Sequence, residues 1–164
     1  MKKIIIYYSY TGHTKKIALY MAKKLNCEVL ELKPTVSYSV DYQTVVDEEQ
    51  KNDTELHIRD YDSIDIDLSA YNEIILGTPV WWYSISPVIR QFLTKENLKG
   101  KKIRPFATNA GWLGKTFNEI AELCKAKGAV YTKGLNVVFT EDYHENKLVT
   151  DISEIDKWLS DENE

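Results

Sequence analysis

Runs of apolar residues that suit buried strands alternate five times with amphipathic stretches that suit helices along this chain of 164 residues. The strands are expected at 4–8, 29–32, 73–77, 102–108 and 129–140, with Gly134 as the place for a break in the last. Such alternation is typical of α/β folds with parallel strands. We therefore expect a doubly wound five-stranded parallel sheet with helices on both faces. The length suits a single domain over residues 1–164.

The expected helices have both a stripe of apolar residues and end signals. The first stripe comprises Ile17, Ala18, Met21 and Leu25, and similar stripes follow in 85–93, 117–124 and 155–159. Ser86-Pro87 is typical of a helix start, and Gly128 of a helix end. Asp151 and Glu154 resemble a capping box that opens the last helix.

Composition excludes several classes of protein. A net charge of −4 and 43% hydrophobic residues fit a folded chain, with no basic stripe for nucleic acid. No apolar run is long enough to span a membrane, so no membrane partner is expected and the cytoplasm is the default location. The remaining titratable candidates, Cys27, Cys124, His57 and His144, are far apart, so we expect no metal site and no chemical role for them.

Residues 34–69 give the weakest signal of secondary structure in the chain. Asp41 is a candidate cap for a short helix with Val45 and Val46 on one side. The following stretch, 47–67, is acid-rich and poor in large apolar residues. Two interpretations are open, a solvated excursion and a partner surface, and the first is favoured.

Unusual residues gather in the loops after the first, third and fourth strands, at 9–14, 78–84 and 109–114. In parallel sheets the carboxyl ends of the strands meet at one edge, where ligands bind near the switch point of the strand order. We therefore expect the three loops to converge.

The first loop combines hydroxyl side chains with a glycine directly before a helix. Backbone N–H groups at a helix N-terminus attract phosphate. The loop has neither the Gly-x4-Gly-Lys pattern of nucleoside triphosphatases nor the Gly-x-Gly-x-x-Gly pattern of dinucleotide sites. It therefore favours a phosphomonoester held mainly by neutral donors, and an ordinary capped turn is the alternative.

The other two loops offer an aromatic wall and a polar rim. Trp81, Trp82 and Tyr83 stand side by side, where they either stack on a planar ligand or plug the sheet edge. Asn109 and the glycines around Trp112 either meet the polar edge of a heterocycle or form a plain turn. Together the loops suit a phosphorylated flat heterocycle, and flavin mononucleotide (FMN) has that shape.

The chain resembles the flavodoxin-like FMN proteins, and most closely the bacterial flavodoxins whose second flavin loop reads Pro-x-Trp-Trp. Residues 3–14 are similar to the signature in which a strand runs into Ser/Thr-x-Thr-Gly-Asn-Thr. Residues 41–46 and 76–82 also resemble that family, and the order of elements matches over nearly the whole chain.

The resemblance implies a role for each loop. The phosphate would be held by Ser9, Thr11, Gly12, His13 and Thr14. The isoalloxazine ring would be flanked by Pro79, Val80, Trp81, Trp82 and Tyr83, with one of the two tryptophans against its face. The other side and the pyrimidine edge would be lined by Thr108, Asn109, Ala110, Gly111, Trp112 and Gly114. No catalytic residue is expected, because the flavin supplies the chemistry.

Three positions depart from the family pattern. His13 stands where asparagine is usual, and it could add charge near the phosphate at low pH. Tyr83 and Ala110 replace glycines that ease backbone rearrangement and close approach. Because the loops offer no cation besides His13, we expect the anionic reduced flavin to be disfavoured and its reduction potential lowered.

The residues leave three functions to weigh against one another. The first is an electron carrier between redox partner proteins. The second is an NAD(P)H-dependent FMN oxidoreductase, similar to quinone reductases, acting on a small acceptor. The third, a phospho-receiver module without flavin, is disfavoured because Tyr7-Tyr8-Ser9 supplies no acidic residue for magnesium. The connection 140–147 is expected to be an exposed loop, with a position near the flavin edge as the minority interpretation.

Overall fold

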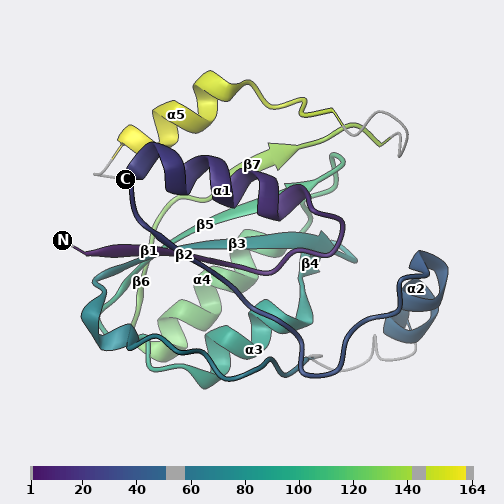
Figure 1. Cartoon of the computed structure of the whole chain (residues 1–164), viewed down its shortest axis with the longest axis horizontal. Helices are drawn as coiled ribbons and strands as arrows, with labels where there is room; N and C mark the ends of the chain where they lie inside the picture. Colours follow the sequence, from purple (N-terminus) through teal and green to yellow (C-terminus); the bar gives the residue numbers. More distant parts are fainter. Residues whose placement is uncertain (1, 51–57, 142–146, 162–164) are drawn as a thin grey trace.

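The computed structural model describes residues 2–50, 58–141 and 147–161. Its sheet is built from β1 (Lys3–Tyr7), β2 (Glu28–Glu31), β3 (Glu73–Trp81), β5 (Lys102–Asn109), β6 (Val130–Tyr131) and β7 (Leu135–Val138). These strands are parallel in the order β2-β1-β3-β5, and both β6 and β7 pair with β5 (Figure 1). The expected parallel sheet is confirmed.

Helices cover both faces of the sheet (Figure 1). On one face lie α1 (His13–Leu25) and α5 (Ile152–Ser160), and on the other α3 (Pro87–Lys95) and α4 (Thr116–Lys127). Alternate strand residues point to opposite faces, so Ile5 and Ile75 join the core under α1 and α5 while Ile4 and Ile74 join the core under α3 and α4. The doubly wound arrangement follows from this two-sided burial.

The helix ends agree with the sequence signals. Pro87 is the first residue of α3, and Gly128 ends α4 in a left-handed conformation. The Asp151 carboxylate accepts from the Ser153 backbone N–H at 2.9 Å and opens α5.

Among the described residues the sheet has seven strands rather than the expected five, because the last predicted strand is two strands and a short strand, β4 (Ser84–Ile85), pairs with β3. Gly134 lies between β6 and β7, and a Cβ there would meet the Phe117 ring at 2.5 Å. The ring leaves room only for glycine backbone, and β6 and β7 pair with separate ends of β5.

The prediction of a loop over residues 78–84 is also wrong. Strand β3 continues to Trp81, and the chain turns back through Trp82 and Tyr83 into the short antiparallel strand β4 (Ser84–Ile85). Both turn residues have positive φ, at 51° and 59°. Two-residue hairpins of this kind usually carry Asn-Gly or Asp-Gly, and this sequence has no such signal.

Residues 34–69 form an excursion from the sheet. In its 47–67 stretch most of the described side chains are exposed, as the solvated interpretation expects, whereas other positions of the excursion are packed. Tyr38 and Tyr61 are buried, Pro34 bridges Tyr61, and the Arg59 guanidinium lies 3.7 Å from the centre of the Tyr38 ring. The predicted short helix is present as α2 (Tyr42–Gln50), and a 3-10 turn, η1 (Leu68–Ala70), precedes β3. His57 and His144 lie outside the described residues.

The amino ends of the central strands contain a buried ion pair. Arg104 of β5 donates to Glu73 of β3 at 3.2 Å, and it also donates to the Trp158 and Asp161 carbonyls at the end of α5. This pair ties the sheet to α5, on the edge opposite the three loops.

Candidate functional site

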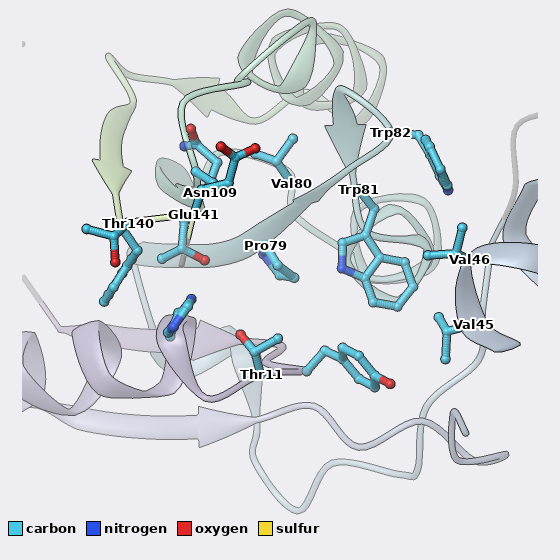
Figure 2. A pocket seen from close by; sticks show the side chains of 15 residues that line it. Thr11, Val45, Val46, Pro79, Val80, Trp81, Trp82, Asn109, Thr140 and Glu141 are labelled. Carbon is cyan, nitrogen blue, oxygen red and sulfur yellow. The ribbon is translucent and has the colours of Figure 1, made fainter. Parts of the chain in front are cut away.

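A cleft of about 240 Å³ opens at the carboxyl edge of the sheet, between the ends of β1 and β3. This is the switch point, because the chain proceeds from β1 toward β2 in one direction and from β3 toward β5 in the other. Its lining residues are Tyr10, Thr11, His13, Val45, Val46, Pro79, Val80, Trp81, Trp82, Thr108, Asn109, Ala110, Phe139, Thr140 and Glu141 (Figure 2). The predicted convergence of the three loops therefore holds in space.

The first loop forms the N-terminus of α1 at one end of the cleft. Gly12 caps the helix with φ 97°, and no atom lies within 4 Å of the position that a Cβ would take there. The Ser9 Oγ accepts from the Gly12 and Lys15 N–H groups, each at 3.2 Å. The first turn of a helix directs further N–H groups outward. This end of the cleft therefore offers backbone donors of the kind that bind anions.

Ser9, Gly12 and Thr14 shape the loop without lining the cleft. The buried Thr14 hydroxyl is 2.7 Å from the Thr108 hydroxyl, which ties the start of α1 to the end of β5. Removing either hydroxyl leaves its buried partner without this bond, so the pair fixes the distance between two of the loops.

His13 lies on the cleft as the first residue of α1. Its imidazole stacks on the Phe139 ring, with centroids 4.1 Å apart and ring planes within 3°. Phe139 follows β7, and its backbone N–H donates to the Asn109 carbonyl at 2.8 Å. The histidine is thus held between the first loop and the chain that follows the last strand.

Aromatic rings form the opposite end of the cleft. Trp81 makes edge contacts with Tyr8, Tyr10 and Tyr38 at centroid distances of 4.8–6.0 Å, so it belongs partly to the core and partly to the cleft. Trp82, at the hairpin turn, lines the cleft yet remains 45% exposed. Figure 2 shows both tryptophans on the side of the cleft where Val45 and Val46 of α2 also lie.

The third loop contributes only its first part to the cleft. Thr108 and Asn109 belong to β5, and Asn109 Oδ1 accepts from the Gly111 N–H at 2.8 Å to start the turn. Tyr83, Gly111, Trp112 and Gly114 are not among the lining residues. Tyr83 and Trp112 are 56% and 59% exposed, and their roles toward a ligand stay predictions.

Four lining residues were not predicted: Tyr10, Val45, Val46 and Phe139. Val45 and Val46 were expected on a helix, but their position over the cleft depends on how the 34–69 excursion folds back. Thr140 and Glu141 begin the 140–147 connection, and they lie at the cleft as the minority interpretation of that connection expects. They follow the last strand, where the strand-end rule places ligands. Residues 142–146 of the 140–147 connection lie outside the described part of the chain.

Few ionisable groups line the cleft within the described residues. They are His13, Glu141 and the phenol of Tyr10, whose pKa is raised by burial and by the nearby Asp41 carboxylate. The Tyr10 hydroxyl donates to the Ser39 carbonyl at 2.7 Å, which holds the excursion against the cleft. Neutral donors and aromatic rings therefore dominate the lining.

The described ranges 2–50, 58–141 and 147–161 offer little to other kinds of site. No group of three His, Cys, Asp or Glu side chains gathers there to hold a metal ion, and none of the helices combines the length and apolarity needed to cross a membrane. Burial raises the pKa of the Cys124 thiol to about 11, so its thiolate is scarce at neutral pH.

Solved structures with the same fold are flavoproteins and flavodoxins. A flavoprotein from Bacteroides eggerthii is 21% identical with a TM-score of 0.78, covering 96% of this chain and 95% of that one. A Lactobacillus acidophilus flavoprotein in complex with FMN is 25% identical with a TM-score of 0.68, covering 96% and 97%. Oxidised flavodoxin 1 from Bacillus cereus is 20% identical with a TM-score of 0.56, covering 97% and 92%.

The family follows from a match to the sequence. The family model described as flavodoxin matches residues 2–151, and the chain therefore belongs to the flavodoxin family. A comparison with curated proteins finds no match.

Proposed function

We propose that this protein binds one FMN non-covalently in the carboxyl-edge cleft and carries electrons between redox partner proteins. The observation that carries the proposal is the single cleft that joins the N-terminus of α1 to the Trp81–Trp82 hairpin. Membership of the flavodoxin family and the FMN complex of the Lactobacillus acidophilus relative support the choice of cofactor.

The residues of the cleft fit the three parts of FMN. The helix N-terminus with Thr11 and His13 suits a phosphate dianion, since its donors are N–H and O–H groups. Pro79 and the two tryptophans offer flat apolar surface for the ring. Asn109 and the neighbouring backbone supply polar groups for its pyrimidine edge.

The chain's contribution is binding, orientation and exclusion of water. Ser9, Gly12 and Thr14 keep the phosphate loop in shape, while Val80 and Thr108 support the ring from the strand ends. When bound, FMN supplies one- and two-electron transfer. Because the described lining has one histidine and one carboxylate, Glu141, we expect the midpoint potential of bound FMN to lie below that of free FMN.

Exposed aromatic residues beside the cleft are the proposed contact for partner proteins. Tyr83 and Trp112 lie on adjoining segments, because the Lys115 N–H donates to the Tyr83 carbonyl at 2.8 Å. Exposed aromatic groups beside a binding cleft favour transient protein contact. We propose the cytoplasm as the location, which agrees with two unpaired cysteines, Cys27 and Cys124.

Titration of the purified protein with FMN tests this function. We expect flavin fluorescence to change in a 1:1 titration with a Kd of about 1 µM or tighter. Riboflavin, which lacks the phosphate, should bind at least about tenfold more weakly, because it leaves the α1 donors unused. Absence of FMN binding, or equal affinity for riboflavin, would contradict the proposed site.

A second candidate is an NAD(P)H-dependent FMN oxidoreductase. Val45 and Val46 lie on the same side of the cleft as Trp82, where a small flat acceptor would find apolar surface (Figure 2). Adding NADH or NADPH to the FMN-loaded protein separates the two functions. Rapid loss of the absorbance at about 450 nm without a second protein favours the enzyme, and slow loss favours the carrier.

A further inference from the structure

The hairpin turn beside the cleft has a backbone conformation that its residues do not favour. Trp82 and Tyr83 both have positive φ, and neither is glycine, asparagine or aspartate. Side chains with a Cβ are strained in this region, so such a turn persists only where its surroundings fix it. The surroundings of this turn are therefore informative.

The first constraint is the segment before α4. The Lys115 N–H donates to the Tyr83 carbonyl at 2.8 Å. Gly114 packs directly on Tyr83, and a Cβ on Gly114 would come within 2.3 Å of the Tyr83 Cβ and 2.4 Å of its carbonyl oxygen. This contact presses the loop that carries Trp112 against the turn.

The second constraint is a buried network below the turn. Arg90 of α3 donates from Nε to one Glu119 oxygen at 2.6 Å and from Nη2 to the other at 3.1 Å. Arg90 Nη2 also donates to the Ser84 hydroxyl at 3.2 Å, and the Ser84 hydroxyl donates to Glu119. The Arg90 and Glu119 side chains are only 9% and 10% exposed.

The network links three elements at one point. Ser84 belongs to β4, directly after the turn, while Arg90 and Glu119 belong to the two helices of one face. Hydrogen bonds to buried charges are stronger than neutral ones and have defined directions. A shift of β4 would break bonds to a buried charge, and that cost resists movement of the turn.

We propose that Arg90, Glu119 and Ser84 form a positioning clamp that fixes the Trp82–Tyr83 turn, and through it the orientation and affinity of the bound flavin. The inference rests on the proposed function. The three residues do not line the cleft, so they act through the turn rather than by touching the cofactor.

The opposite edge of the sheet supplies a matched control. Glu73 and Arg104 form another buried pair, 2–5% exposed, that joins the strands to the end of α5. A change there perturbs stability without reaching the hairpin. An effect seen for Glu119 and absent for Glu73 therefore belongs to the clamp.

The test compares Glu119→Gln with Glu73→Gln in the full chain. Urea unfolding should show that both variants are destabilised. FMN titration should show about tenfold weaker binding for Glu119→Gln and an unchanged Kd for Glu73→Gln. Visible circular dichroism of the bound flavin and its midpoint potential should change in the first variant alone.

A milder variant keeps the test informative if Glu119→Gln does not fold. Ser84→Ala leaves the Arg90–Glu119 pair intact and removes its link to β4, so FMN binding should weaken about threefold with a matching dichroism change. Wild-type affinity and spectra in either folded clamp variant overturn the inference, as does an equal loss in Glu73→Gln. Failure of the wild-type protein to bind FMN overturns the proposed function and the inference together.

Discussion

Among the described residues, a buried arginine–glutamate pair lies near each edge of the sheet, and the two pairs have different surroundings. At the amino edge, Arg104 and Glu73 lie among regular strands, and Arg104 also satisfies carbonyls at the end of α5. At the carboxyl edge, Arg90 and Glu119 lie beside a strained turn with half-exposed aromatic side chains.

The contrast indicates that the amino edge of the sheet serves stability, whereas the carboxyl edge serves the proposed function. At the amino edge the backbone follows the local preferences of its residues: a glycine in the left-handed conformation ends α4, and β6 begins after it. These preferences fail at the carboxyl edge, where Trp82 and Tyr83 adopt left-handed conformations that cost roughly 1–2 kcal/mol each. Proteins depart from local preferences mainly at functional sites, and the rest of the fold offsets the cost.

The largest expected effect comes from breaking the amino-edge pair. Arg104→Ala leaves the buried Glu73 carboxylate without its partner, which should lower the free energy of unfolding by about 3–5 kcal/mol. Urea unfolding measures this loss. The FMN affinity of the folded variant should equal that of the wild type, and a weakened affinity would show that the two edges are not independent.

The next effect tests the contact between Gly114 and the turn. Gly114→Ala forces a Cβ against Tyr83 and should cost about 2–4 kcal/mol with a clear loss of FMN affinity. Gly100→Ala is the control, because Gly100 also has positive φ but open space around it, and about 1 kcal/mol is expected. Thermal unfolding and FMN titration compare them; equal costs would refute the packing argument.

Most of the fold could be predicted from the sequence, because buried strands and helix caps are local signals. Ile4–Tyr8 reads as a buried strand, and Ser86-Pro87 and Gly128 mark helix ends without knowledge of their neighbours. The break at Gly134 depends on a ring from α4, and the hairpin at Trp82 is maintained by distant contacts. Neither cause is visible along the chain.

The lining of the cleft likewise includes residues that local signals predict and residues that depend on distant contacts. Thr11, His13 and Trp81 could be placed from strand ends alone, since the strand order brings those ends together. Val45 and Val46 reach the cleft only through the packing of the 34–69 excursion, which includes the Arg59–Tyr38 contact. Such tertiary placement has no signature in a single sequence.

A smaller effect distinguishes two exposed tryptophans. Trp82→Ala removes ring surface from the cleft and should weaken FMN binding about tenfold, or about 1.4 kcal/mol. Trp112→Ala removes a similarly exposed ring that does not line the cleft, and its FMN affinity should stay at the wild-type value. Equal losses in the two titrations would place the flavin nearer the third loop than proposed.

The smallest effect is a pH dependence at the clamp. Burial acts to raise the pKa of Glu119, but its bonds to Arg90 and Ser84 outweigh burial and hold the pKa below the ordinary 4.5. The carboxylate therefore contributes its full stability above pH 4.5, and that contribution is lost as the pH falls through the lower folded pKa.

The measurement is urea unfolding at several acidic pH values. Above about pH 4.5 the two proteins should respond alike, and below it the wild-type free energy of unfolding should fall more steeply with acid than that of Glu119→Gln. Parallel curves for the two proteins would mean that protonation of Glu119 does not weaken its bonds to Arg90 and Ser84.

A crystal structure of the protein grown with FMN examines the proposed site itself. The phosphate should lie at the N-terminus of α1 near Thr11 and His13, with the ring against Trp81 or Trp82 and its polar edge toward Asn109. FMN bound elsewhere, or a phosphate that does not contact the start of α1, would contradict the account.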